Sequence, residues 1–235
     1  MAGKYTDMQK AHYEQDAAKW TVTNKDPVVG SFDEHNSWTD YDEYLFRDVV
    51  GEMSEKVLLD FGCGPGRNLV KYNNKFLRLD GVDISTKNIE NAKLWLQHNG
   101  CKVGNLYSNN GIDLSCIPEG VDYDVVMSTI ALQHICVHEI RKGYFEEFFR
   151  VLKPGGVFTA QMGFGAGHNS SVSYYDNFYD ASGTNSAADT RVDDADQLKS
   201  DLYSIGFEDF NHYIRPRGPG DSHNNWIFFN AKKPE

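Results

Sequence analysis

From Val57 onward, short apolar segments alternate with amphipathic helical patterns along the sequence. This alternation is typical of a mostly parallel β-sheet covered by helices, because each helix carries the chain back to begin the next parallel strand. Apolar residues recur at three- and four-residue spacing from Ile140 to Leu152 and from Ala195 to Ile205, as amphipathic helices require. We expect seven strands, at Val57–Asp60, Phe76–Ile84, Val103–Tyr107, Tyr123–Thr129, Gly156–Met162, Phe207–Tyr213 and Trp226–Ala231.

The length and composition favour one domain with a large core, since the chain has 235 residues, of which 40% are hydrophobic and 24% charged. We divide residues 1–235 into an N-terminal helical lid (1–55), a core (56–162), a loop-rich segment (163–190) and a final helix with strands (191–235). Tyr13 and Trp20 are seven residues apart, which would place them on one helix face. Irregular segments as long as 163–190 usually bind something, so we expect it to hold a substrate.

Charge and cysteine content exclude several classes of protein. The formal net charge is -11, which disfavours a nonspecific hold on nucleic acid because such binding uses clustered Lys and Arg. The four cysteines form no CxxC pair, so we expect neither a zinc site nor a disulfide framework, and no metal. No stretch resembles a signal peptide or approaches a membrane-spanning length, so we expect a cytoplasmic protein without a membrane partner.

Residues 57–68, VLLDFGCGPGRN, join the first expected strand to a turn that contains Gly62, Gly64 and Gly66. In an open parallel sheet such a turn lies at the ligand crevice, where glycines let backbone N–H groups approach a ligand. The spacing GxGxG differs from the GxGxxG of dinucleotide sites, and no P-loop lysine follows. Asp60 would repel phosphates but attract an ammonium group. Asp83 ends the second strand, where a carboxylate can accept hydrogen bonds from ribose hydroxyls. An amino-acid-bearing nucleoside fits both carboxylates.

Four motifs then match one family in order. DFGCGPG at 60–66, GVDIS at 81–85, DLSCIP at 113–118 followed by YDVVMSTIALQHI at 123–135, and VLKPGGVF at 151–158 make the chain resemble the class I S-adenosylmethionine-dependent methyltransferases that act on small molecules. The resemblance covers about residues 55–162. It implies a Rossmann-like α/β fold, with helices on both faces of a seven-stranded, mostly parallel sheet whose last strand is antiparallel. The implied cofactor is S-adenosylmethionine.

The resemblance also implies roles for individual residues. Asp60, Gly62, Cys63 and Gly64 would line the methionine part of the cofactor, and Asp83 would hold the ribose. The adenine would contact Ile84, Asp113 and Leu114, and Ser128 with Ile130 would flank the sulfonium. Two of these residues have simpler structural alternatives, because Asp83 could cap the following helix and Asp113 could be a turn residue.

Candidate residues for the acceptor side come from three regions. His134 follows the fourth strand and suits a general base, or it only shapes the site. The loop-rich segment offers aromatic faces and amides for a polar acceptor, unless it packs on itself as a surface loop. Tyr13 and Trp20 would either close over the cofactor or pack in the core. The candidate acceptor-binding residues are Tyr174, Tyr175, Asn177, Tyr179, Asn185 and His168, whereas His212 and His223 are expected to be solvated.

The sequence therefore predicts methyl transfer from S-adenosylmethionine to an oxygen or nitrogen of a small polar metabolite, a sugar being one option. Self-association into a homodimer is left open. Three alternatives remain: an aminopropyl transferase of the same fold, a cofactor-binding module without catalytic activity and, on the glycine turn alone, an oxidoreductase that uses NAD.

Overall fold

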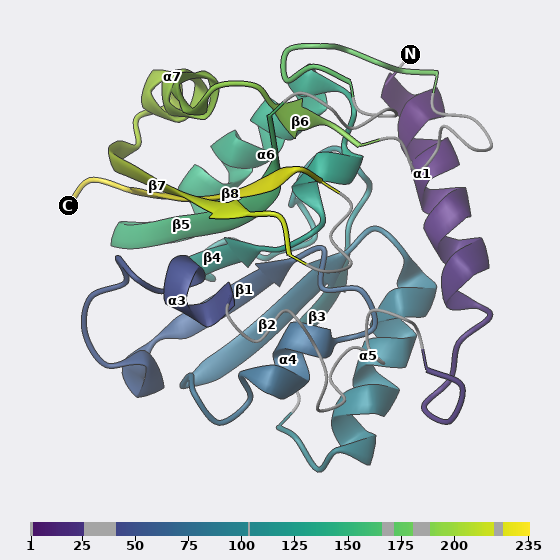
Figure 1. The fold of residues 1–235 in the computed structure, drawn as a ribbon. Helices are drawn as coiled ribbons and strands as arrows, with labels where there is room; N and C mark the ends of the chain where they lie inside the picture. The colour runs from purple at the N-terminus through teal and green to yellow at the C-terminus, as the bar shows by residue number, and fades with distance from the viewer. Residues whose placement is uncertain (1, 26–40, 103, 166–171, 181–188, 219–222) are drawn as a thin grey trace.

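The computed structural model describes residues 2–25, 41–102, 104–165, 172–180, 189–218 and 223–235, which contain an eight-stranded sheet (Figure 1). Seven strands follow the order β3-β2-β1-β4-β5-β8-β7, and β6 pairs with β5 at one side. The strands are β1 (Val57–Phe61), β2 (Arg78–Asp83), β3 (Leu106–Ser108), β4 (Tyr123–Ser128), β5 (Leu152–Phe164), β6 (Arg191–Val192), β7 (Glu208–Pro216) and β8 (Asn225–Lys232).

Strand direction confirms the expected topology. β1 pairs in parallel with β2 and β4, and the parallel pairing continues to β3 on one side and β5 on the other. β8 is antiparallel to both of its neighbours, β5 and β7. The strand order changes direction between β1 and β4, so the ends of these two strands form the crevice where a ligand is expected in this class of sheet.

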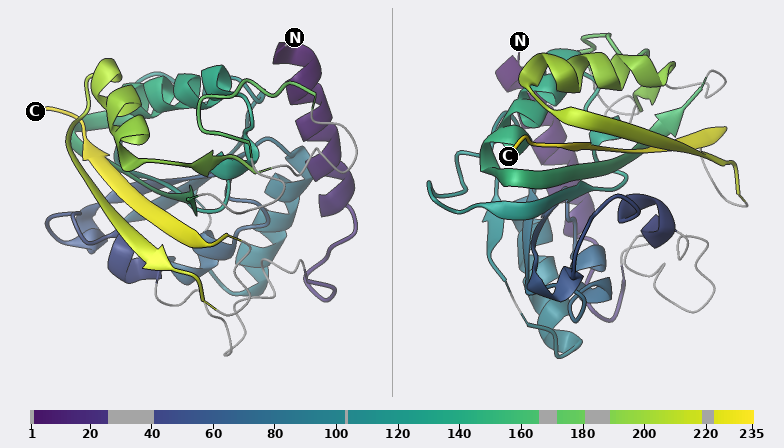
Figure 2. Two further views of the ribbon diagram at one scale, coloured as in Figure 1. Left: turned by 45° about the horizontal axis from the view of Figure 1, so that its top comes forward. Right: turned by 90° about the vertical axis from the view of Figure 1, so that its left-hand side faces the viewer.

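Helices cover both faces of the sheet, as expected. Figure 2 shows α7 above the sheet and α3 below it when the sheet is viewed nearly edge-on. The two faces have separate cores, because Leu59 and Phe61 of β1 pack with α6 and α7, whereas Leu58 packs with α3, α4 and α5. Asp60 alternates onto the second of these faces. These helices are α3 (Tyr41–Leu45), α4 (Arg67–Lys71), α5 (Thr86–His98), α6 (His138–Val151) and α7 (Ala195–Ile205).

Helix α1 (Ala2–Ala17) crosses the edge of the sheet where β1 and β4 end (Figure 1). Its N-terminal half is fixed by Tyr5, whose hydroxyl accepts a hydrogen bond of 2.8 Å from the Cys136 N–H. Its C-terminal end is fixed to α5, because Asn91 donates to the Ala17 carbonyl at 2.9 Å. Glu14 also accepts from the Thr86 and Lys87 N–H groups at the start of α5, at 2.7 and 3.0 Å. The helix therefore bridges the two layers over the crevice.

Local details differ from the sequence-based expectations in three places. Helix α1 ends at Ala17, so Trp20 lies in the following turn, and its expected place on one helix face with Tyr13 is wrong. β5 begins at Leu152 directly after α6, four residues before the expected strand start at Gly156. The two-residue strand β6 was not expected, since its pairing with β5 depends on tertiary structure.

The helix expected from Ala195 to Ile205 is confirmed as α7. Asp194 caps α7, and its side chain accepts from the Asp196 N–H at 3.0 Å. Gln197 completes a capping box by accepting from the Asp194 N–H at 3.2 Å.

Candidate cofactor and acceptor site

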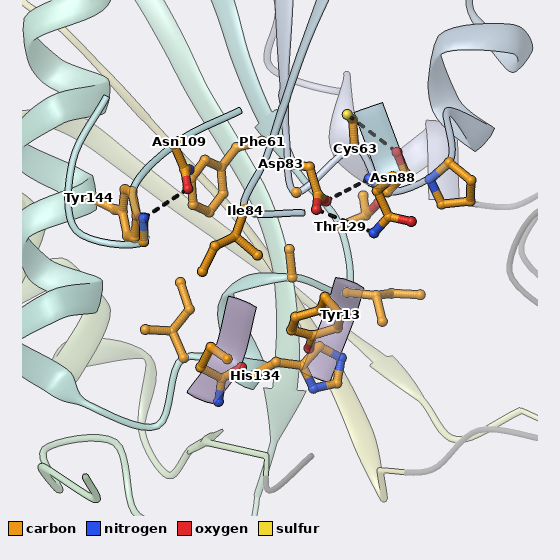
Figure 3. Close-up of a pocket in the computed structure, with 18 of the residues that line it drawn as sticks. Tyr13, Phe61, Cys63, Asp83, Ile84, Asn88, Asn109, Thr129, His134 and Tyr144 are labelled. Atoms are coloured by element: carbon orange, nitrogen blue, oxygen red, sulfur yellow. Dashed lines mark hydrogen bonds between the residues drawn. The ribbon is translucent and has the colours of Figure 1, made fainter. Parts of the chain in front are cut away.

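A cavity lies where β1, β2 and β4 end, and α1 closes one side of it (Figure 3). Its wall includes the glycine turn after β1, residues after β2 and β4, and the α1 residues Thr6, Gln9, Tyr13 and Asp16. Figure 3 shows Tyr13 and His134 across the cavity from Asp83 and Cys63. The structure thus brings together most of the expected cofactor residues with the expected base.

The glycine turn has a shape that larger residues cannot adopt without strain. Gly62 has φ +72°, and a Cβ atom there would lie 2.3 Å from the Ala131 Cβ. Gly64 has φ +52° and faces open space. The Gly62 N–H donates to the Val82 carbonyl at 2.8 Å, which ties the turn to the end of β2. Cys63 is buried between these glycines and also lines the cavity. The turn leaves room for a ligand at Gly64.

Asp83 links the turn to α5. Its Oδ2 accepts from the Gly64 N–H at 2.9 Å, and its Oδ1 accepts from the Ser85 N–H at 2.9 Å. Burial raises the pKa of Asp83, although these N–H groups oppose the shift. Ser85 itself caps α5 by accepting from the Asn88 N–H at 3.0 Å. Asp83 therefore organises the turn and also exposes part of its carboxylate to the cavity.

Asp60 provides a buried carboxylate with unused capacity. It is 1% exposed and is not among the residues that line the cavity, although its neighbours Phe61 and Gly62 and the nearby Asn68 line it. Its Oδ1 is 3.5 Å from the Asn68 Nδ2, but its Oδ2 has no hydrogen-bond partner. Burial raises the pKa of Asp60 to about 7. A buried carboxylate oxygen without a donor is costly, so the position fits a ligand that brings an ammonium group.

Polar side chains after the glycine turn surround Asp60. Arg67 and Asn68 begin α4, and both line the cavity although each is more than nine-tenths buried. The Thr129 Oγ1 accepts from the Asn68 Nδ2 at 2.9 Å and from the Arg67 guanidinium at 3.4 Å. These three residues connect the first turn of α4 to the end of β4.

The segment after β4 enters the cavity through an unusual backbone conformation. Ile130 has φ +57°, and its N–H donates to the Gln161 Oε1 at 2.9 Å. A β-branched residue in this region is strained, which is common beside ligands. Ser128 is fully buried and donates to the Phe61 carbonyl at 3.1 Å, so it supports the cavity from behind and does not line it.

His134 lies at the opposite end of the cavity and is held by a carboxylate. Its Nδ1 is 2.6 Å from the Asp189 Oδ1, and the Asp189 Oδ2 is 2.9 Å from the Nε2 of His223. Hydrogen bonds and charge from the two histidines outweigh burial and hold the pKa of Asp189 well below its usual range. The Thr190 N–H donates to the Gln133 carbonyl at 2.6 Å and fixes the backbone beside Asp189.

His223 is 1% exposed, so its expected solvation is wrong. It packs between Gly163 and the Trp226 ring, whose centroid is 4.7 Å from its own.

The expected adenine residues are only partly at the cavity. Ile84 lines it, together with Asn109 and Gly111, which were not singled out from the sequence. Asp113 is not among the lining residues, and its Oδ1 accepts from the Ser115 N–H at 3.0 Å. This bond and the Ser115 side chain lower the pKa of Asp113. Leu114 is also outside the lining, in the core with α6.

The described aromatic residues of the loop-rich segment pack on α6. None of Tyr174, Tyr175, Asn177 and Tyr179 lines the cavity. Tyr174 is buried and donates to Asp201 at 2.7 Å, and Tyr179 donates to Glu139 at 2.9 Å. Asn185 and His168 lie outside the described residues. Trp20 lines a smaller neighbouring hollow with Pro65 and Trp95.

Sequence reasoning did not single out Arg67, Asn68, Thr129 or Asp189. The signal for the first two was present, because polar residues that open the helix after a glycine turn face the same crevice. Asp189 had no comparable signal within the acidic run DTRVDDAD. Within the described ranges, no group of three or more His, Cys, Asp or Glu residues is placed to hold a metal ion, and no helix is long and apolar enough to cross a membrane.

The fold and cavity define a class: an open, Rossmann-like sheet with a cavity at the switch point between β1 and β4, where proteins of this fold bind nucleoside ligands. Comparisons with known proteins show which members of this class the chain is similar to. Residues 58–156 match the model of a methyltransferase domain. A ubiquinone biosynthesis O-methyltransferase of Nitrosomonas europaea is 30% identical over 88 residues, which are 37% of this chain and 37% of that protein. The chain thus matches little more than a third of that relative's length.

Solved structures with similar folds extend over nearly the whole chain. The N-methyltransferase NodS of Bradyrhizobium japonicum, in complex with S-adenosylhomocysteine, has a TM-score of 0.64 at 12% identity and covers 97% of this chain and 100% of its own. Phosphoethanolamine N-methyltransferase 2 of Haemonchus contortus, in complex with S-adenosylmethionine, also has a TM-score of 0.64, at 17% identity, covering 95% of this chain and 60% of its own. Together these comparisons identify residues 58–156 as a methyltransferase domain and support a class I S-adenosylmethionine-dependent methyltransferase, with S-adenosylmethionine as its cofactor.

Proposed function

We propose that the protein transfers a methyl group from S-adenosylmethionine to an oxygen or nitrogen of a small polar metabolite, a sugar being one member of that class. The observation that carries the proposal is the placement of His134, fixed by Asp189, across one cavity from Asp83 and the glycine turn. Cofactor and acceptor would then meet in a single cavity.

The cofactor would be held by residues that the structure leaves ready for it. Asp83 would accept from the ribose hydroxyls, and Asp60 would accept from the methionine ammonium at its unpartnered Oδ2. Gly64, with open space around it, would allow the thioether chain to pass close to the backbone. Ile84, Asn109 and Gly111 would contact the adenine, in place of Asp113 and Leu114. When bound, the cofactor supplies an electrophilic methyl group on a positively charged sulfur.

The acceptor would be activated at His134. The Nδ1 of the ring lies 2.6 Å from the Asp189 Oδ1, so a proton on Nδ1 would be stabilised by the charge of that carboxylate and Nε2 would be the basic nitrogen. Nε2 would take the proton of the acceptor as its oxygen or nitrogen attacks the methyl carbon. Asp189 is ionised because its pKa is lowered, and so it would stabilise the imidazolium that forms. Tyr13 and Gln9 on α1 supply polar groups beside this path.

The proposal is tested by a search for the methylated product. The protein is incubated with a metabolite extract and S-adenosylmethionine labelled in its methyl group, and products that gain the label are identified by mass spectrometry. With the product known, His134→Ala should lower kcat by about 10²- to 10⁴-fold for an alcohol acceptor. His212→Ala, which removes an exposed histidine on β7, should leave kcat unchanged.

Two other outcomes would support the rival functions. Tight binding of S-adenosylhomocysteine with no labelled product from any extract would favour the noncatalytic cofactor-binding module. Transfer of an aminopropyl group from decarboxylated S-adenosylmethionine would favour the aminopropyl transferase.

A further inference from the structure

A second buried histidine lies behind Asp189, on the side away from the cavity. His223 is 1% exposed, and its Nε2 is 2.9 Å from the Asp189 Oδ2. The Nδ1 of His134 lies 2.6 Å from the other oxygen, Oδ1. One carboxylate thus stands between two imidazole rings, of which His134 lines the cavity and His223 does not. His223 is therefore placed to act on the base through Asp189, without touching a ligand.

The fold holds the His223 ring in one place. His223 lies just before β8, whose Trp226 pairs with Gly163 of β5. A Cβ atom on Gly163 would lie 2.2 Å from the His223 Nδ1, so the ring occupies space that only a glycine leaves open. The Trp226 ring packs against it, with the centroids 4.7 Å apart. A ring packed between a strand and an indole can keep a hydrogen bond in a constant direction.

The hydrogen bond between His223 and Asp189 restricts the carboxylate. Burial opposes the ionisation of Asp189, but the hydrogen bonds and charges of the two histidines lower its pKa. An ionised carboxylate can only accept, so the His223 Nε2 carries the hydrogen of this bond. The terminal torsion of an aspartate side chain is broad when nothing holds it. A donor on Oδ2 therefore limits its rotation while Oδ1 faces His134.

This arrangement bears on which nitrogen of His134 is basic. Nε2 can take a proton only while Nδ1 carries the ring hydrogen, and the partner of Nδ1 decides this. We propose that His223 is a positioning residue, which holds Asp189 so that its Oδ1 keeps the hydrogen on the His134 Nδ1. This inference rests on the proposed function, because a fixed tautomer serves catalysis only if His134 takes a proton from the acceptor.

Nitrogen-15 NMR of the histidine rings in the full chain tests the inference without an acceptor. Spectra are recorded at a pH where the His134 ring is neutral, and His134→Gln identifies its signals. The wild type should show mainly the tautomer with its hydrogen on Nδ1. In His223→Leu, which cannot donate to Asp189, the signals should shift to those of a ring that shares its hydrogen between both nitrogens.

Turnover of the acceptor found in the product search tests the consequence for catalysis. His223→Leu should lower kcat by about 10- to 100-fold, which is part of what a general base supplies. The KM for S-adenosylmethionine should stay within about two-fold, because His223 does not line the cavity. His223→Gln, whose amide can donate to the same oxygen, should recover most of kcat and the Nδ1 tautomer.

A second variant moves His223 without removing it. In Gly163→Ala the new methyl group would take the space of the ring, so this change should displace His223 and reproduce both effects of His223→Leu. The double variant should be no slower than the slower single variant, since both changes break the same contact. If His223→Leu does not fold, Gly163→Ala decides the matter.

His138→Leu is the matched control. The Nε2 of His138 is 2.8 Å from the Asp201 Oδ2, so the change removes a histidine–carboxylate contact of the same kind outside the cavity. Both kcat and the tautomer of His134 should remain those of the wild type. Loss of a half-buried histidine by itself is thereby separated from loss of His223.

The results separate the inference from the function on which it rests. A wild type without the Nδ1 tautomer, or a tautomer and kcat that persist in His223→Leu and Gly163→Ala, overturns the role of His223 and leaves the methyltransferase intact. A changed tautomer with wild-type kcat also overturns it, because the position of Asp189 then has no effect on turnover. A wild type that methylates nothing in any extract overturns the proposed function, whatever the tautomer shows.

Discussion

At the scale of single residues, the burial of Asp60 costs stability when its carboxylate is ionised, and we expect the same carboxylate to bind the ammonium group of the cofactor. Its pKa of about 7 in the folded protein, set mainly by burial, exceeds the ordinary Asp value of 3.8. The folded state therefore holds more protons than the unfolded state between these values. The stability that the protonated group contributes is fully present below the ordinary pKa and is lost as the pH rises through about 7. Without a bound cation, an ionised Asp60 destabilises the fold.

Asp60→Asn should therefore raise the melting temperature of the ligand-free protein at about pH 8, where the wild-type carboxylate is ionised. The gain should be on the order of 1–2 kcal/mol and should shrink at about pH 5, where the wild-type group is protonated. The same change should weaken S-adenosylhomocysteine binding about 10- to 100-fold, because the ammonium loses its charged partner. Thermal melts at the two pH values and calorimetric titration measure both effects.

An exposed carboxylate provides the comparison for Asp60. Asp122→Asn, just before β4, should change neither quantity by much. If Asp60→Asn melts lower than the wild type and binds as tightly, Asp60 has a structural role only.

At the scale of elements, Glu14 ties α1 to α5 in addition to the bond from Asn91 to the Ala17 carbonyl. Glu14 accepts from two N–H groups at the N-terminus of α5, where a negative charge is favourable. Burial opposes ionisation, but the bonds from Lys87 and Thr86 lower the pKa of Glu14 overall. Its contribution is therefore present above the ordinary pKa of a glutamate and is lost as the pH falls through the lowered value. A contact of this kind sets how firmly α1 covers the cavity.

Glu14→Gln should loosen α1 without unfolding the sheet. We expect faster amide hydrogen exchange over residues 2–17 and weaker S-adenosylhomocysteine binding, by about two- to ten-fold, since α1 carries part of the cavity wall. Asp7→Asn, an exposed change on the same helix, is the matched control. Unchanged exchange in the Glu14 variant would mean that Tyr5 and Asn91 hold the helix by themselves.

Some elements of the fold could be predicted from the sequence alone. β1, the glycine turn and α7 follow from local patterns, because apolar runs, glycines in turns and helical periodicity act within a few residues. The approach of Asp189 to His134 does not follow from such patterns. It requires the Thr190 N–H to bond the Gln133 carbonyl, two residues that lie far apart in the sequence. Only the assembled sheet creates that pairing.

At the scale of the whole molecule, ligand binding should stabilise the fold by mass action. If the cavity binds S-adenosylhomocysteine, a concentration of 100 times its Kd should add about 2.7 kcal/mol to the free energy of unfolding. For a domain of this size that corresponds to a rise in melting temperature of roughly 5–10 °C. NADH at the same concentration should produce no rise, because the GxGxG turn and Asp60 do not suit a pyrophosphate.

Differential scanning fluorimetry with both ligands distinguishes the two cofactor classes. A rise with NADH and none with S-adenosylhomocysteine would favour the oxidoreductase over the methyltransferase. A rise with neither would contradict the placement of any nucleoside at the end of β1.

The partners of His134 have a consequence for how relatives of this chain can differ. His134 lies within residues 58–156, which match the methyltransferase domain, whereas Asp189 and His223 come from the last third of the chain. Changes confined to that third would alter the surroundings of His134 while residues 58–156 stayed the same. Descendants of one ancestor could thus acquire new acceptors without having to evolve cofactor recognition again.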